Sequence, residues 1–167
     1  FDLVQSIADG LVDRGIQLVF WRGESQYENF FSELCARHPG RVGTYIGFEP
    51  ALSQEIYAGA DVFIMPSKSE PCGLAQMVAC RYGTPPIVRE TGGLRDSITL
   101  HLGEGNGFTF AGYSAHELYD ACCRAQDRYY SKEDWNNLIR YDMECDFSWD
   151  VSAKSYEGLY NETANLW

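Results

Sequence analysis

Short apolar runs alternate along this chain with longer segments in which apolar residues recur at helical spacing. Val62–Met65 is fully apolar and Ile16–Trp21 is apolar except for Gln17, a composition that favours strands buried on both faces. Strands are expected at Ile16–Trp21, Val42–Ile46, Val62–Met65, Pro86–Val88 and Gly107–Phe110. Helices are expected at Phe1–Gly15, Ser25–Arg37, Ala51–Ala58, Gly73–Tyr82, Leu94–Ile98, Ala115–Tyr130, Lys132–Met143 and Trp149–Ala164. This order predicts an α/β fold: a doubly wound, mostly parallel Rossmann-like sheet with helices on both faces.

The chain has the size and composition of one domain. It has 167 residues, of which 45% are hydrophobic, and its polar linkers are too short to divide it. Residues 1–167 are therefore expected to fold together around one core. The helix expected at Phe1–Gly15 has no strand before it, so we expect the natural chain to continue upstream.

Charge and motif content exclude several functions. The net charge is −11 and the sequence shows no cluster of basic residues, which argues against nucleic acid as a partner. No apolar run is long enough to cross a bilayer. The cysteines form no CxxC pair, and His38, His101 and His116 lie far apart, so no metal site is expected. The absence of an early GxGxxG loop argues against a nicotinamide or flavin cofactor. Scattered cysteines are typical of a reduced, cytoplasmic protein.

The loop Pro66–Cys72 is the richer of two candidate binding loops. It leaves a buried strand and enters a helix, and in a doubly wound sheet ligands bind at this end of the strands. Glu70 can accept a hydrogen bond from a sugar hydroxyl, and Gly73 allows a ligand close to the backbone. The amides of Gly73, Leu74 and Ala75 can donate to hydroxyl or phosphate oxygens. A plainer alternative is that Glu70 caps the helix within an ordinary turn.

The second candidate loop carries Thr91, Gly92 and Gly93. It follows a strand and precedes a helical turn, which makes it a possible cradle for an anion. Many loops contain this tripeptide, and a tight turn that needs two glycines is the alternative.

Four blocks together resemble one enzyme family. They are Tyr57–Ser67, Glu70–Leu74, Arg81–Arg89 and Thr91–Leu94, and their order and spacing resemble bacterial glycogen synthase and plant starch synthase. The resemblance extends to Gly107–Phe110 and to Asp146–Trp149, so it covers the whole chain. These enzymes are retaining GT-B glycosyltransferases with an active site between two Rossmann-like domains. The resemblance implies that this chain is the C-terminal, nucleotide-sugar-binding domain, and that it lacks its first strand and the N-terminal acceptor domain.

The resemblance also implies roles for individual residues. Glu70 is the expected catalytic-site residue that holds hydroxyls of the donor glucose, and Cys72, Gly73 and Leu74 would line its pocket. Backbone amides at Leu74 and Ala75 would meet the diphosphate. Phe48 falls where the family often has a Tyr that stacks on the nucleobase, and an aromatic ring of either kind can stack.

The sequence departs from the family pattern at several positions. Ala75 replaces a frequent Thr, and Val78 stands where many GT-B enzymes have a second Glu. Trp21–Glu24 replaces a glycine-rich, acidic turn. In this family, the Arg and Lys that clamp the donor phosphates belong to a motif normally found just upstream of the residue that matches Phe1.

The expected function is the donor-binding half of an enzyme that transfers glucose from ADP-glucose or UDP-glucose to the non-reducing end of an α-1,4-glucan. The α-glucan acceptor would bind through the missing N-terminal domain, and the chain alone would not catalyse transfer. The enzyme would act in the cytoplasm, or in the plastid of a plant. The alternatives are a non-catalytic nucleotide-sugar or glucan binding module, and another GT-B glycosyltransferase such as a sucrose-type synthase. Val78 argues against the last of these.

Overall fold

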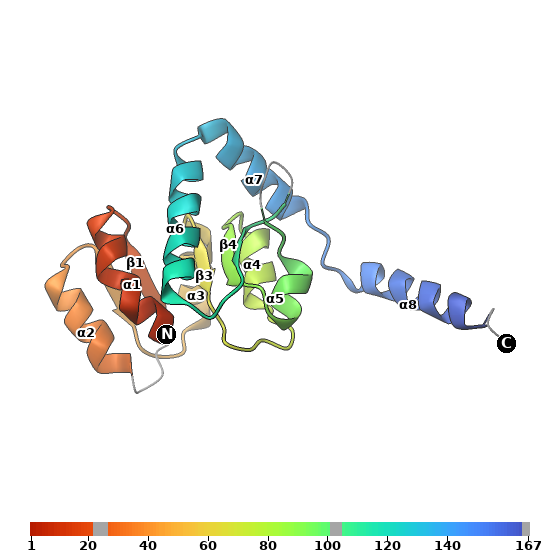
Figure 1. Ribbon diagram of the computed structural model, residues 1–167, viewed down its shortest axis with the longest axis horizontal. Coiled ribbons are helices and arrows are strands. Elements are labelled where there is room, and N and C mark those ends of the chain that lie inside the picture. The colour runs from red at the N-terminus through yellow and green to blue at the C-terminus, as the bar shows by residue number, and fades with distance from the viewer. Residues whose placement is uncertain (22–26, 101–104, 165–167) are drawn as a thin grey trace.

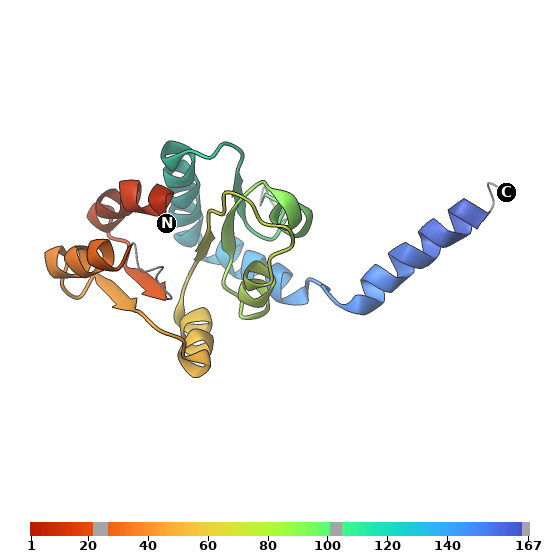
Figure 2. The same ribbon diagram turned by 90° about the horizontal axis from the view of Figure 1, so that it is seen from below.

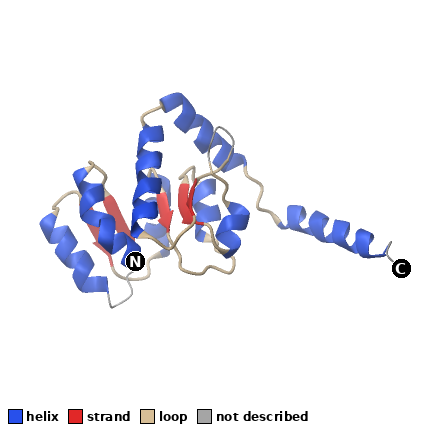
Figure 3. Ribbon diagram, viewed as in Figure 1, coloured by secondary structure: helices blue, strands red, loops and turns tan. Residues whose placement is uncertain are grey.

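The computed structural model of the chain describes residues 1–21, 27–100 and 105–164. Strands and helices alternate up to the last strand, after which three helices follow (Figure 1, Figure 3). The elements are α1 (Asp2–Asp13), β1 (Leu18–Trp21), α2 (Glu28–Arg37), β2 (Val42–Tyr45), α3 (Pro50–Gly59), β3 (Phe63–Met65), α4 (Ala75–Arg81), β4 (Pro86–Arg89), α5 (Gly92–Ser97), β5 (Phe108–Phe110), α6 (Ala115–Tyr129), α7 (Lys132–Glu144) and α8 (Trp149–Ala164). In Figure 2, α1 and α6 lie on one side of the strands and α3 and α4 on the other. The predicted α/β class, with parallel strands and helices on both sides, is confirmed.

The strands form two parallel sheets rather than the single sheet that the sequence predicted. β1 pairs with β2, with Leu18 opposite Val42, and β4 lies between β3 and β5 in the second sheet. Within the described residues no ladder joins β1 to β3, so each of these strands is paired along one edge only. Apolar periodicity identifies a strand, but it does not specify which edges meet, and for this reason the sequence could not show the division.

One hydrophobic core nevertheless spans both sheets. The buried face of α1 consists of the six residues whose spacing predicted the helix: Leu3, Val4, Ile7, Ala8, Leu11 and Val12. These residues share a cluster with Phe20 of β1 and with Ile87 and Phe108 of the second sheet, and α6 contributes Leu118 and Ala121 to it. Burial of such side chains contributes about 1.5–3 kcal/mol each, so α1 and α6 hold the two sheets in one unit.

Several helix starts differ from the prediction, and two of these differences fall on the candidate loops. α4 begins at Ala75 rather than at Gly73, which has a φ of +74° and lies in the loop before the helix. α5 begins at Gly92, so the expected turn Thr91–Gly93 is partly the first turn of a helix. The loop Pro66–Cys72 therefore continues through Leu74. The predicted turn at Trp21–Glu24 lies largely outside the described residues.

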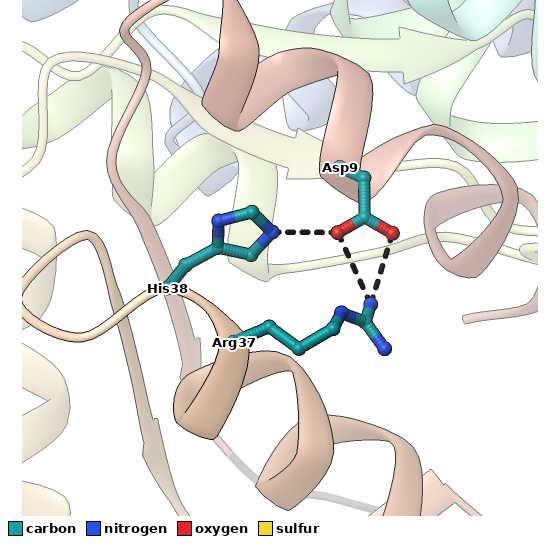
Figure 4. A network of polar contacts seen from close by, with 3 residues as sticks. All are labelled: Asp9, Arg37 and His38. Carbon is teal, nitrogen blue, oxygen red and sulfur yellow. Dashed lines mark hydrogen bonds and ion pairs between the residues drawn. The ribbon is translucent and has the colours of Figure 1, made fainter.

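A polar network joins α1 to the end of α2 (Figure 4). Nε2 of His38 lies 2.6 Å from Oδ1 of Asp9, and Nη2 of Arg37 donates to both carboxylate oxygens of Asp9, at 3.1 Å and 2.9 Å. Hydrogen bonds from His38 and Arg37 lower the pKa of Asp9. His38 thus makes a contact that joins the end of α2 to α1.

α8 extends away from the rest of the molecule (Figure 1, Figure 2). None of its described residues is buried, and Trp149 at its start is 85% exposed. No helix in the described part of the chain is both long and apolar enough to cross a membrane.

Candidate functional site

Two loops leave neighbouring strands at the same edge of the second sheet. The segment 66–74 follows β3 and Glu90–Thr91 follows β4, and β3 and β4 are parallel with Met65 opposite Val88. Because carboxyl ends of parallel strands meet at one edge, the two loops are neighbours there. Glu70 is half-buried in the first loop, and Ser67 Oγ donates to its Oε2 across 3.4 Å.

The two loops touch through their backbones. The amide of Gly93 donates to the carbonyl oxygen of Glu70 across 3.1 Å. A β-carbon added to Gly92 would overlap the carbonyl of Glu70, and one added to Gly93 would overlap the carbonyl of Cys72. Gly92 also has a φ of +44°, which a side chain disfavours. Contact between the loops therefore explains why both positions are glycine, whereas their predicted contact with a ligand stays a prediction.

A buried glutamine forms hydrogen bonds with the backbone of the first loop. Gln76 of α4 is fully buried, and its Nε2 lies 2.9 Å from the carbonyl oxygen of Gly73 and 3.3 Å from that of Cys72. The same nitrogen lies 3.0 Å from Ser97 Oγ, which in turn donates to the carbonyl oxygen of Gly93 across 2.7 Å. Both loops are therefore linked by side chains as well as by backbone.

Arg89, at the end of β4, supports the first loop from its other end. Its Nε donates to the carbonyl oxygen of Ser67 across 2.9 Å, and its Nη2 donates to that of Lys68. The ring of Tyr113 lies 5.8 Å from both Lys68 Nζ and Arg89 Cζ. The Tyr113 hydroxyl donates to Asp2 Oδ1 across 2.6 Å, and this bond raises the pKa of Tyr113 to about 12 and lowers the pKa of Asp2.

The backbone of the first loop is oriented with its carbonyls toward the protein. The carbonyls of Ser67, Lys68, Glu70, Cys72 and Gly73 all accept hydrogen bonds from the groups described above. In contrast, within residues 1–21, 27–100 and 105–164 no hydrogen bond is donated by the amides of Gly73, Leu74 or Ala75. The segment therefore has unpaired donors close in sequence to the Glu70 carboxylate, and an oxyanion or a sugar hydroxyl can bind to groups of these kinds.

Of the remaining predicted site residues, three are exposed, whereas Ala75 and Thr91 are half-buried. Cys72 is a free, exposed thiol, and Leu74 is 69% exposed. Phe48 is 67% exposed and lies between β2 and α3, so it follows a strand of the other sheet. The structure thus brings Glu70 and Cys72 into contact with Gly92 and Gly93, and it links Gly73 to Gly93 through Gln76 and Ser97. Phe48 lies at a separate strand end. In the described residues no three His, Cys, Asp or Glu side chains are grouped to hold a metal.

Sequence reasoning missed Gln76 and Arg89. A signal was present for Gln76, because it occupies the helix face that it shares with the buried residues Ala79 and Cys80. A polar residue at an apolar position of a helix indicates a hydrogen-bonding task. Arg89 gave no such signal, since a charged residue at the end of a strand is common.

A second polar feature lies away from the two loops. Asp142 of α7 is 1% exposed, and neither of its carboxylate oxygens has a hydrogen-bond partner in the described part of the chain. Burial raises its pKa to about 8. Nearby, a pocket of about 480 Å³ includes none of the predicted site residues; it is lined by Ser97, Thr99, Asn106, Tyr141, Glu144, Cys145, Asp146 and Phe147.

The fold and the two loops define a class. A domain of parallel strands with helices on both sides belongs to the doubly wound α/β class, in which ligands bind at the carboxyl ends of the strands. Comparison with known families gives the particular one, since residues 12–138 match the family described as glycosyl transferases group 1. The chain belongs to this family.

Individual relatives agree with that assignment. The chain is 48% identical to glycogen synthase of Desulforudis audaxviator and 45% identical to glycogen synthase of Bacillus licheniformis; each alignment covers 96% of this chain. The catalytic domain of starch synthase IV from Arabidopsis thaliana, bound to ADP and acarbose, superimposes with a TM-score of 0.83 at 34% identity over 98% of this chain. The resemblance to glycogen and starch synthases is confirmed. The chain spans about a third of each relative: 33% and 34% of the two glycogen synthases and 36% of the starch synthase.

Proposed function

We propose that this chain is the donor-binding part of a glycogen- or starch-synthase-type enzyme, which transfers glucose from ADP-glucose or UDP-glucose to an α-1,4-glucan with retention. The observation that carries the proposal is that the segment after β3 contains both the half-buried Glu70 carboxylate and backbone amides that donate no hydrogen bond within the described residues. A nucleotide sugar presents hydroxyls to such a carboxylate and a diphosphate to such amides. The starch synthase relative is described as bound to ADP, which supports a nucleotide donor.

The residues divide the chemistry between them. Glu70 accepts hydrogen bonds from hydroxyls of the donor glucose and fixes the orientation of the ring, with Cys72, Gly73 and Leu74 around it. The amides of Leu74 and Ala75 stabilise the negative charge that develops on the departing diphosphate, with the Thr91–Gly93 loop beside them. Phe48 stacks on the base. No metal or cofactor is needed for these steps.

We further propose that the natural protein contains segments outside this chain. The edges of β1 and β3 that carry no ladder in the described residues fit one additional parallel strand, which would join both sheets into one. A separate domain would bind the α-glucan acceptor and complete the active site. Glucose transfer by residues 1–167 alone is then negligible. Each factor of ten in rate needs about 1.4 kcal/mol of transition-state stabilisation, and the groups outside this chain would supply part of it. The enzyme would act in the cytoplasm, or in a plastid.

Isothermal titration calorimetry of the natural polypeptide that contains this chain tests the proposal. ADP-glucose, UDP-glucose and a maltooligosaccharide are titrated in turn, and transfer of radiolabelled glucose to glycogen is measured alongside. We expect one of the nucleotide sugars to bind and its glucose to be transferred. Binding of a nucleotide sugar without transfer would indicate a non-catalytic module, and absence of nucleotide-sugar binding would overturn the proposal.

A further inference from the structure

Gln76 is an unusual residue for its place in the molecule. It is 0% exposed in the first turn of α4, on the face that also carries the fully buried residues Ala79 and Cys80. Burying an amide is costly unless its polar atoms are hydrogen-bonded. Its nitrogen has acceptors around it, but its oxygen is buried and has no partner in the described residues. A side chain selected only to fill the core would be apolar, so the unpaired oxygen needs an explanation.

The nitrogen of Gln76 provides that explanation. It reaches the carbonyl oxygens of Cys72 and Gly73, near the end of the first loop and just before α4 begins. The Gln76 side chain also fills the space that a side chain at position 73 would need, because a β-carbon on Gly73 would lie 2.5 Å from Gln76 Oε1. Gly73 and Gln76 thus fit together as a pair, and the loop keeps one conformation over the buried amide.

Ser97 extends this contact to the second loop. Its hydroxyl lies 3.0 Å from Gln76 Nε2 and donates to the carbonyl of Gly93, whose own amide donates to the carbonyl of Glu70. The hydrogen bonds therefore lead from Gly73 through Gln76, Ser97 and Gly93 back to Glu70. The two loops are held as one unit, and neither Gln76 nor Ser97 needs to touch a ligand to affect it.

We propose that Gln76 and Ser97 are positioning residues, which hold the Glu70 carboxylate and the amides of the Gly73 segment at a fixed separation so that both ends of a nucleotide sugar are bound together. The proposal rests on the proposed function. It assigns part of the donor affinity to two side chains that lie beneath the site. Preorganisation of this kind improves affinity by reducing the ordering cost of binding.

Two substitutions test the role, each with a matched control in the natural polypeptide. Gln76→Met keeps the length of the side chain and removes its donors, with exposed Gln5→Met as the control. Ser97→Ala removes the hydroxyl, and Ser97→Thr restores it. We expect Gln76→Met and Ser97→Ala to weaken ADP-glucose binding in calorimetry roughly three- to ten-fold, the range that loss of one hydrogen bond gives. ADP, which lacks the glucose that Glu70 holds, should lose less affinity, and Ser97→Thr should recover most of the loss.

A second measurement separates this inference from the proposed function. Hydrogen exchange followed by mass spectrometry reports on peptides that contain Gly93 without any ligand. Faster exchange there in Gln76→Met and Ser97→Ala, but not in Gln5→Met, supports the coupling of the loops. Unchanged exchange, or equal loss of ADP and ADP-glucose affinity, overturns the positioning role. If the unsubstituted protein binds no nucleotide sugar, the proposed function fails, and the exchange result alone decides whether the loops are coupled.

Discussion

The amide of Gly93 donates a hydrogen bond to the carbonyl oxygen of Glu70 across 3.1 Å, so the loop after β4 fixes the backbone of the loop after β3. The contact is possible only because position 93 has no side chain, since a β-carbon there would overlap the carbonyl of Cys72. The residue with the most direct part in the proposed chemistry thus depends on a glycine 23 positions later in the chain.

Gly93→Ala should therefore destabilise the protein. Forcing a methyl group into the backbone of the neighbouring loop costs about 1–3 kcal/mol, as overpacking in well-packed regions does. Gly59→Ala is the matched control, because a β-carbon on this last residue of α3 meets no atom within 4 Å. Urea unfolding checks both variants, and we expect Gly59→Ala to be neutral or slightly stabilising. Equal stability of the two variants would contradict the backbone contact described here.

Glu70→Gln should weaken donor binding while leaving the fold intact. The half-buried carboxylate has one described side-chain contact, the 3.4 Å hydrogen bond from Ser67, so its loss affects stability little. A hydrogen bond to a charged group contributes about 1.5–3 kcal/mol, and we expect ADP-glucose affinity to fall roughly ten- to hundred-fold. Calorimetry and thermal unfolding measure the two effects, with exposed Glu55→Gln as the control. Unchanged affinity in Glu70→Gln would show that the carboxylate does not hold the donor.

Asp142 should make the protein less stable as the pH rises. Its folded-state pKa of about 8 lies above the ordinary value of 3.8, so the folded protein retains a proton that the unfolded chain releases. Its contribution to stability is complete below pH 3.8 and is lost as the pH rises through 8, at up to about 1.4 kcal/mol per pH unit.

Asp142→Asn removes this titration. We expect the free energy of unfolding of Asp142→Asn to exceed that of the unsubstituted protein by a margin that grows from pH 5 to pH 8. Guanidinium unfolding at several pH values measures it, and Asp13→Asn, an exposed carboxyl at the end of α1, is the control. A difference that is constant with pH would mean that the Asp142 carboxyl is not protonated in the folded state.

The network of Asp9, Arg37 and His38 should stabilise the fold weakly, and its pH dependence should be opposite to that of Asp142. Asp9 and Arg37 are about half exposed, with relative side-chain exposures of 54% and 47%, so Asp9→Asn should cost less than about 1 kcal/mol. Because the pKa of Asp9 is lowered, its contribution is present above pH 3.8 and is lost as the pH falls below that value. Unfolding at pH 7 and pH 3, and at low and high salt, checks this. A loss that persists in 1 M salt would contradict a screened surface contact.

Local patterns in the sequence predicted most of the architecture. The buried face of α1 was predicted residue by residue, because a 3.6-residue period identifies a helix face directly. The division of the strands into two sheets was not predictable, since edges are matched by contacts between distant segments. The start of α4 was misplaced by two residues because Gly73 adopts a positive φ, which its residue type permits but does not require.

The sequence indicated the two loops of the candidate site, but it did not indicate the side chains that hold the loops together. Motif resemblance located Glu70 and Gly73, whereas the links from Gln76 and Ser97 depend on the packing of α4 and α5 against β4. Phe48 illustrates the limit of motif transfer. Its predicted stacking on the nucleobase depends on the position of the segment between β2 and α3 relative to the two loops when a ligand is bound.

The most direct test of the central claim is a crystal structure of the natural polypeptide with ADP-glucose or UDP-glucose bound. The account predicts hydroxyls of the glucose within hydrogen-bond distance of the Glu70 carboxylate, and diphosphate oxygens at the amides of Leu74 and Ala75. A nucleotide sugar bound elsewhere, for example in the pocket lined by Asn106 and Tyr141, with Glu70 free of contacts to it, would contradict the account.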